Sequence, residues 1–302
     1  MIKINFSYKY LLFLFALIAL ISFSEIGNSA DQDGRDPVCA ATLVAGTRCE
    51  TQPTTQNIIF HKVAFCTALP TAPTSTTTTG MTNCSTVFEN TAGATVSIQK
   101  GIGVTPAGTF TDPPYGNYTF AYVELNPVIT YKANLVFNNA NALSSDGAAV
   151  GPNCHTNGTA YFYWDFLKGI TCTGAAAGVA VDTTNTINSL DNNAAVYSGE
   201  TTEGTNPGTT RGFLIKTNGT LATTSSSGNI GDVAKLVFFM PMTANITPDT
   251  TSYNLLYNNS RGMVVWLNNN GAASGTPPVN ANNGFYNIGF NAAYFDMTFQ
   301  IQ

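Results

Sequence analysis

Charged side chains are scarce in this chain. They make up 10% of its 302 residues, whereas about 25% is usual for soluble domains. The 12 lysines and arginines are scattered along the sequence, and binding to phosphate backbones needs a clustered basic face. Nucleic acid is therefore disfavoured as a partner. Threonine and asparagine take the place of charge, so we expect salt to affect the surface little.

Histidine and several catalytic motifs are rare or absent. The chain contains only His61 and His155, and it has no CxxC and no GxSxG motif. A Ser–His–Asp arrangement would have to use one of these two imidazoles. We expect structural roles for both, because His61 lies in an apolar run and His155 follows a cysteine. Glu124, Glu200 and Glu203 do not indicate a glycosidase carboxyl pair by their spacing alone. We predict no catalytic residue, no cofactor and no enzymatic activity.

Long hydrophobic runs are also missing, apart from Leu11–Ile21. This run is shorter than the roughly 20 residues that a membrane-spanning helix needs, but it follows two lysines and precedes small residues, as in a secretory signal. Residues 1–30 are therefore predicted to be a signal peptide, cleaved near Ala30 or alternatively after Ser29. An uncleaved N-terminal anchor is the other interpretation. No later run is long enough to span a membrane, so we expect none in the mature chain.

Six cysteines remain after this segment. An even number in an exported chain favours disulfides, although six cysteines allow 15 connectivities. They fall into neighbouring pairs, which predict the bridges Cys39–Cys49, Cys66–Cys84 and Cys154–Cys172. Each bridge would close a short loop and contribute ~3 kcal/mol. The predicted location is secreted, periplasmic or at the cell surface.

The hydrophobic pattern has the period of strands, not helices. Tyr115–Leu125 and Val128–Phe137 flank Asn126-Pro127, and the second segment alternates apolar and polar residues, as half-buried strands do. Asn218-Gly219 separates two further short strands and is a strong hairpin signal. Turn signals recur between such segments. We predict an all-β fold of antiparallel β-sandwiches, stapled by disulfides and carrying long polar loops.

The sequence indicates the domain boundaries less clearly than it indicates the strands. A Gly/Ser/Asn-rich stretch around residues 138–153 is the strongest boundary signal. We expect a polar leader with the first cysteine pair at residues 31–53, a first β-sandwich domain at 54–140 and a second β-rich domain at 141–302. A single domain over both halves is the alternative.

Pro114–Thr119 (PYGNYT), followed by alternation up to Leu125, resembles the entry into a late strand of secreted bacterial immunoglobulin-like or prealbumin-like β-sandwich domains. The resemblance covers residues 57–137, and the families concerned are largely uncharacterised. It implies a sandwich fold and a binding, adhesive or spacer role. It implies no functional residue.

Two groups of residues are candidate ligand sites. Asp31, Asp33 and Asp36 lie close together in the leader, and converging carboxylates can bind Ca²⁺. The distal glutamate of a calcium loop is missing, however. A solvated acidic leader is therefore the alternative, and no metal site is predicted. The second group is aromatic. Trp164, Trp266 and Tyr257 could stack on a sugar or fill a β core.

Three functions are compatible with these observations. The favoured one is a secreted or cell-envelope protein that is not an enzyme and has a structural or adhesive role. It would act through its surface, with envelope components or further copies of itself as partners. In that case a strand such as Lys235–Met240, or an unpaired terminal strand, could donate its edge to a neighbour. A glycan- or small-molecule-binding module is the second, and a secreted hydrolase the third.

Overall fold

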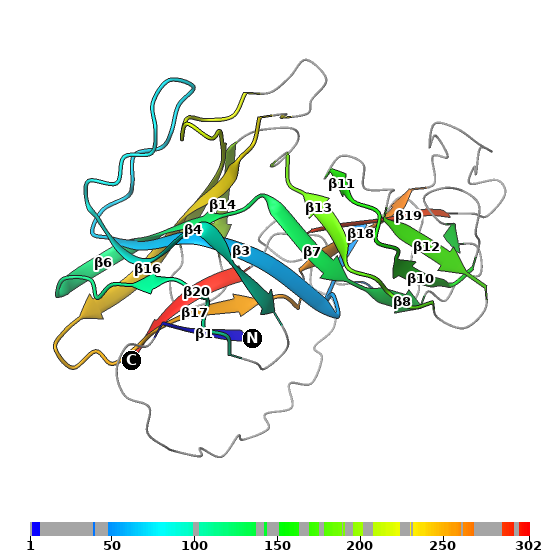
Figure 1. Ribbon diagram of the computed structural model, residues 1–302, viewed down its shortest axis with the longest axis horizontal. Helices are drawn as coiled ribbons and strands as arrows, with labels where there is room; N and C mark the ends of the chain where they lie inside the picture. The colour runs from blue at the N-terminus through cyan, green and yellow to red at the C-terminus, as the bar shows by residue number, and fades with distance from the viewer. Residues whose placement is uncertain are drawn as a thin grey trace, which may run out of the picture.

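The computed structural model describes residues 2–6, 39, 48–98, 103–136, 142–143, 151–162, 169–174, 178–188, 190, 196–201, 208–223, 230, 232–260, 262–268, 286–292 and 296–302. Every regular element in these ranges is a β-strand, which confirms the predicted all-β fold (Figure 1). In this part of the chain there is no helix with the length and apolar character needed to cross a membrane.

The largest sheet has ten strands. They are β3 (Thr55–Cys66), β4 (Cys84–Ile98), β5 (Thr109–Phe110), β6 (Gly116–Leu125), β7 (Val128–Lys132), β11 (Tyr161–Phe162), β13 (Thr183–Thr186), β14 (Val196–Thr201), β15 (Gly208–Ile215) and β16 (Lys235–Ile246). Their order is β11-β13-β7-β3-β6-β16-β15-β14, with β4 beside β3 and β5 beside β4. Because β16 lies between β6 and β15, its Lys235–Met240 segment is not an edge, and the prediction that it could donate one is wrong.

The described residues also form three smaller sheets. Their strands are β1 (Ile2–Phe6), β17 (Tyr253–Asn258) and β20 (Asp296–Ile301); β2 (Arg48–Thr51), β9 (Ala142–Leu143), β18 (Met263–Asn268) and β19 (Tyr286–Ala292); and β8 (Asn134–Val136), β10 (Asn153–Thr156) and β12 (Ile170–Thr173). The orders are β1-β17-β20, β2-β18-β19-β9 and β12-β10-β8. The ladders are antiparallel as predicted, except that β11 pairs with β13 and β9 pairs with β19 in parallel.

The strands β6 and β7 form one interrupted path along β3. The N–H of Asn126 donates to the carbonyl oxygen of Ile59 at 2.9 Å. The Asn126 side chain then turns back, because its Oδ1 accepts from the N–H of Val128 at 2.9 Å. Pro127 has no N–H to offer to a ladder. The predicted break at Asn126-Pro127 is therefore confirmed, and it divides β3 between two partners.

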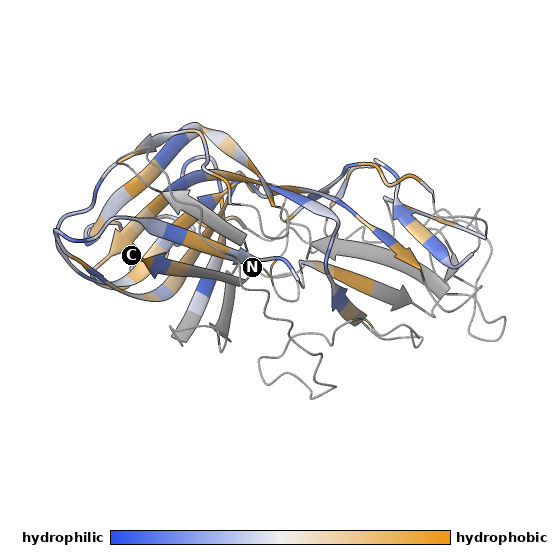
Figure 2. Ribbon diagram, turned by 90° about the horizontal axis from the view of Figure 1, so that it is seen from below, coloured by the Kyte–Doolittle hydropathy of each residue, from blue (hydrophilic) through white to orange (hydrophobic). Residues whose placement is uncertain are grey.

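The sheet β1-β17-β20 packs against one face of the largest sheet. Phe65 on β3 makes edge-on ring contacts with Tyr253 at 5.5 Å and with Phe299 at 5.4 Å between centroids. Around it lies the main buried cluster, with residues from β3, β4, β6, β16, β17 and β20. Figure 2 shows the hydrophobic positions alternating with hydrophilic ones along these strands. This pattern is what a two-layer β packing requires.

The other two small sheets lie beyond β7, together with β11 and β13 at that end of the largest sheet (Figure 1). These strands form a second group. Its buried cluster includes Tyr131 and Ala133, Tyr161, the cysteines of two disulfides, and Met263 and Val265 of β18. The hydroxyl groups of Tyr131 and Tyr161 are hydrogen-bonded to each other inside it.

The boundary expected at residue 140 does not separate two sheets. β16, from the second half, pairs with β6 from the first half, and β13 pairs with β7. The small sheet that covers the main core also brings β17 and β20 from the second half. The leader expected at residues 31–53 likewise contributes β2, which pairs with β18. Strand pairs therefore connect all three of the expected segments.

The predicted signal segment contributes one described strand. β1 pairs with β17 at the edge of the small sheet. Residues 7–30 lie outside the described residues. Cleavage near Ala30 would therefore remove a strand from this sheet.

Candidate interaction surface

The three disulfides are the three that the sequence predicts. Cys66–Cys84 and Cys154–Cys172 each join residues that lie directly opposite each other in an antiparallel ladder. Within the leader, the disulfide joins Cys39 to Cys49 of β2. The N–H of Cys39 also donates to the carbonyl oxygen of Glu50 at 2.9 Å. Three disulfides indicate an oxidising compartment.

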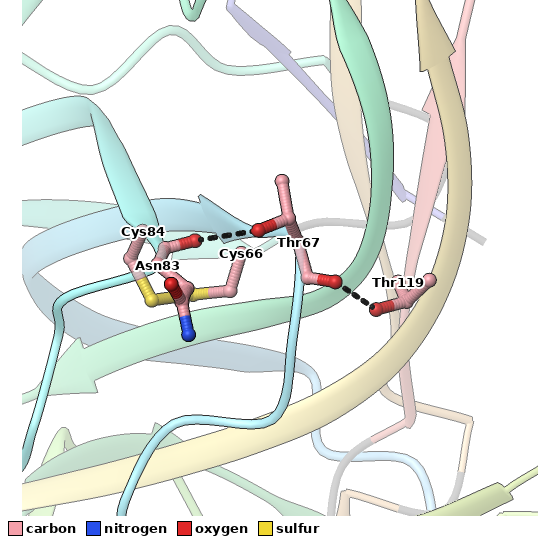
Figure 3. Close-up of a disulfide and its surroundings, with 5 residues drawn as sticks. All are labelled: Cys66, Thr67, Asn83, Cys84 and Thr119. Carbon is pink, nitrogen blue, oxygen red and sulfur yellow. Dashed lines mark hydrogen bonds between the residues drawn. A yellow bond between two sulfur atoms is a disulfide. The ribbon is translucent and has the colours of Figure 1, made fainter.

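The Cys66–Cys84 disulfide fixes the base of a long loop, residues 67–83, which we call the threonine loop (Figure 3). Next to the disulfide, the N–H of Thr67 donates to the carbonyl oxygen of Asn83 at 2.9 Å. The hydroxyl of Thr119 on β6 donates to the carbonyl oxygen of Thr67 at 3.1 Å. The base of the loop is thus held both across its own ends and to the neighbouring strand.

Further from the disulfide, the threonine loop is held by its own backbone. Thr71 and Gly80 exchange two N–H···O bonds, at 3.1 and 3.0 Å. At the tip, the N–H of Thr74 donates to the carbonyl oxygen of Thr77 at 3.0 Å, and the hydroxyl oxygen of Thr74 accepts from the N–H of Thr77 at 3.0 Å. These bonds make the loop a narrow, closed structure over its whole length.

A second hairpin supports the threonine loop from the side. It turns at Asn218-Gly219, as predicted, with Gly219 at φ +83°, a conformation that glycine adopts without strain. Thr78 forms an isolated antiparallel bridge with Thr220 of this hairpin. The N–H of Leu221 donates to the carbonyl oxygen of Thr74 at 2.8 Å. The loop is therefore fixed on the protein surface at its tip as well as at its base.

The outer side of the threonine loop is exposed and uncharged. Residues 67–83 contain no Asp, Glu, Lys, Arg or His, and Leu69 is 37% exposed. The exposed members are Thr67, Ala68, Leu69, Thr71, Thr74, Ser75, Thr76, Thr77, Thr78, Thr82 and Asn83. On its inner side, Ala72 and Met81 pack against a third buried cluster, which includes Tyr122, Phe213 and Phe239. The loop thus has an apolar underside and an outer surface of hydroxyl and methyl groups.

Beside this third cluster, Glu124, which the sequence named only as a possible glycosidase carboxyl, has two partners that the sequence did not indicate. Glu124 is 8% exposed, and its Oε2 accepts from the Tyr122 hydroxyl at 2.7 Å. Its Oε1 is bound by Lys235 Nζ. Burial, and next the Glu124 charge, raise the pKa of Tyr122 above its ordinary value. Both carboxylate oxygens are occupied by structural partners, which does not suit a nucleophile or general acid. The shared face of positions 122 and 124 is the signal that could have revealed this group.

The two histidines have structural surroundings. His61 lies at a β-bulge, because the register of β3 with both β4 and β6 shifts between Phe60 and Lys62. The His155 ring lies against Gly178, where a Cβ would come within 2.1 Å of the imidazole. Among the described residues, neither Nδ1 atom has a hydrogen-bond partner. No described carboxylate therefore orients either imidazole through its Nδ1 atom.

The remaining candidate residues are not brought together. The Tyr257 side chain is 0% exposed in the main core and offers no ring face to a ligand. The backbone of Trp266 lies in β18, while its side chain, together with Trp164, Asp31, Asp33 and Asp36, lies outside what the structure describes. Within the described residues, no group of three His, Cys, Asp or Glu side chains could hold a metal ion. The Glu200 side chain and Glu203 are also outside them.

A shallow depression of about 470 Å³ lies between the ends of β16 and β20. Its polar lining comes from Thr243, Asn245, Thr247, Asp249 and Gln300. Next to the depression, the N–H groups of Thr251 and Ser252 both donate to the carbonyl oxygen of Gln302. Amide and hydroxyl groups predominate beside one carboxylate, so this depression suits a polar ligand.

Comparison with known proteins adds no relative to this description. No family model, no curated protein and no solved structure matches the chain. Function therefore has to be argued from the residues and their geometry.

Proposed function

We propose that this chain is exported with removal of residues 1–30 and acts, without enzymatic activity, as a structural or adhesive protein of the cell envelope or the extracellular space. The predicted signal and the three disulfides support export. The binding surface is the threonine loop.

The observation that carries this proposal is the fixed conformation of an exposed loop. Ordering a loop on binding costs free energy, so a loop that is already ordered binds more tightly for the same contacts. Here the ordering is supplied by the Cys66–Cys84 disulfide, the Thr71–Gly80 pair and the contact of Thr74 with Leu221. The disulfide and the flanking Ala72 and Met81 lie on the face of the sheet opposite the main core. A surface role explains why these bonds are present.

The chemistry of the loop defines the kind of partner. Its outer side offers hydroxyl groups, threonine methyl groups and the exposed part of Leu69, and no ionic group. Such a surface suits an uncharged envelope component, recognised by hydrogen bonds and small apolar contacts. Since Coulombic attraction is missing, binding should survive an increase in salt.

A hydrogen bond at the start of β6 supports the resemblance to immunoglobulin-like sandwiches. The Tyr118 hydroxyl donates to the carbonyl oxygen of Pro114 at 2.7 Å. A tyrosine that enters a strand and bonds back to the backbone a few residues upstream forms the tyrosine corner of β-sandwich domains. Such domains are common in extracellular proteins, which agrees with the proposed role.

The polar depression at the ends of β16 and β20 favours a second candidate, a module that binds a glycan or another small polar molecule. Its lining of amides and hydroxyls, with the carboxylate of Asp249, lies apart from the threonine loop. Thr243→Lys would block it without touching the loop.

The test of the proposed function is binding to isolated cell envelopes. Mature protein should sediment with envelopes equally at low and high salt. Leu69→Glu adds a charge to the exposed loop and should weaken the apparent affinity for envelopes about tenfold, a loss of ~1.4 kcal/mol. Val181→Glu, at a residue that is 48% exposed outside the loop, is the matched control and should bind normally. Equal binding by all three proteins would reject the loop as the binding surface.

A further inference from the structure

The edge of β17 accepts an antiparallel strand with apolar residues at alternate positions. β1 supplies that strand: Ile2 lies opposite Tyr257, Ile4 opposite Leu255 and Phe6 opposite Tyr253. The polar Lys3 and Asn5 alternate with them and lie opposite Leu256 and Asn254. Directly opposite residues of a ladder share a face of the sheet.

The paired positions on β17 border the main core. Leu255 and Tyr257 are 0% exposed, and Tyr253 packs against the same cluster. Phe65 of the opposing sheet makes an edge-on contact with Tyr253. An apolar strand beside β17 therefore extends the layer that covers the core.

Export with cleavage near Ala30, on which this inference rests, would remove β1. Among the described residues, β17 would then pair only with β20. Positions 253–257 would present a row of unpaired backbone groups, which readily pair with another strand. Natural edges are commonly protected by Lys, Pro or an inward charge. β17, with the sequence YNLLYN, has none of these.

The sequence of β17 is suited to antiparallel pairing with a second copy of the same strand. Around Leu255, the residues two places away on either side are both tyrosine, at 253 and 257. Two antiparallel copies centred on Leu255 would place Tyr253 opposite Tyr257 of the second copy, and Leu255 opposite its equivalent. Asn254 would lie opposite Leu256 of the second copy. Large residues would then occupy the same alternate positions that Ile2, Ile4 and Phe6 occupy in β1.

We propose that the mature protein forms a two-fold symmetric dimer in which β17 of a second copy takes the place of β1. The interface is self-complementary, as a two-fold contact must be. The new N-terminal segment does not compete for this role. Its first residues, DQDGRDPV, are polar and charged and do not repeat the apolar alternation of β1.

The experiment uses full-length protein expressed with its own leader and purified after export. Intact mass first establishes whether residues 1–30 are absent, which tests the proposed processing separately from dimerisation. Sedimentation velocity over a concentration series then measures self-association. A synthetic peptide of residues 1–8 is added as a competitor, with a control peptide of equal composition in which the apolar alternation is shifted by one residue.

Two variants locate the interface. Leu256→Lys places a charge on the β17 edge and should weaken dimerisation about tenfold or more, since like charges then lie diagonally across the two-fold axis. Gln300→Lys adds the same charge at an exposed residue of β20 and should leave the dimer unchanged. Circular dichroism confirms that both variants fold, and the peptide arm gives an answer even if Leu256→Lys does not fold.

The proposal predicts a processed dimer that the residue 1–8 peptide dissociates and the shifted peptide does not. A processed protein that stays monomeric overturns it. So does a dimer that neither the peptide nor Leu256→Lys affects, because its interface then lies elsewhere. A monomer that binds the peptide, or a strand of another protein, would show that the edge accepts a different partner and also overturns the self-pairing.

Discussion

Cys66 and Cys84 lie directly opposite each other where β3 ends and β4 begins, and their disulfide closes the threonine loop at its base. Cys154 and Cys172 have the same relationship on β10 and β12, with the same sequence separation of 18. The two bridges therefore have equal loop lengths in different parts of the fold. Their removal separates an effect on stability from an effect on the binding surface.

Replacing Cys66 and Cys84 together by alanine should lower the free energy of unfolding by ~3 kcal/mol, through the loss of loop-closure entropy. Residues 67–83 should also become sensitive to proteolysis, and envelope binding should fall. The double variant of Cys154 and Cys172 should lose similar stability and keep its binding. Chemical denaturation and the envelope assay check both variants. Equal binding by the two would contradict the assigned role of the threonine loop.

Glu124→Gln should cost about 1–3 kcal/mol of stability, because Glu124 is buried and its removal leaves Lys235 without its partner charge. Glu89→Gln is the control, since the Lys62–Glu89 pair of 2.8 Å is more exposed. That variant should change stability by about 0–1 kcal/mol. Urea denaturation at neutral pH measures both. A larger effect at Glu89 than at Glu124 would argue against the buried pair.

Stability should decline in alkaline solution. Burial raises the pKa of both Tyr122 and Tyr161 above the ordinary value, while tyrosines of the unfolded chain lose their protons near pH ~10. Above that pH the unfolded state binds fewer protons than the folded state, so the free energy of unfolding falls as pH rises. Denaturation series between about pH 8 and 11 test this. Tyr122→Phe should make the decline less steep, and an unchanged slope would contradict the assignment.

Tyr118→Phe should lower stability by about 1 kcal/mol, because it removes the hydrogen bond to the Pro114 carbonyl and keeps the packed ring. Tyr115→Phe changes a residue that is 71% exposed and should have little effect. Thermal or chemical unfolding of the two variants provides the comparison. If the two variants are equally stable, the Tyr118 bond does not hold the corner.

Local features of this fold were predictable from sequence because short-range chemistry decides them. The alternation around Asn126-Pro127, the turn at Asn218-Gly219 and the three neighbouring disulfides are all confirmed. Each depends on a few adjacent residues: a proline without an N–H, a glycine with positive φ, and cysteines close in the chain.

Long-range pairings were not predictable in the same way. The central place of β16 and the crossing of the boundary at residue 140 depend on contacts between β16 and β6, more than a hundred residues apart. From sequence alone, Tyr257 could either stack on a ligand or fill the core. Its place in the core depends on contacts with other strands. The ion pair of Glu124 with Lys235 likewise joins residues 111 positions apart. No local pattern encodes such partners.

Intact-mass analysis of the protein recovered from outside the cytoplasm tests export most directly. We predict a chain that begins at Asp31, or at Ala30 for the alternative cut, with all six cysteines oxidised. A chain that begins at Met1, recovered in the cytoplasm with free thiols, would contradict it.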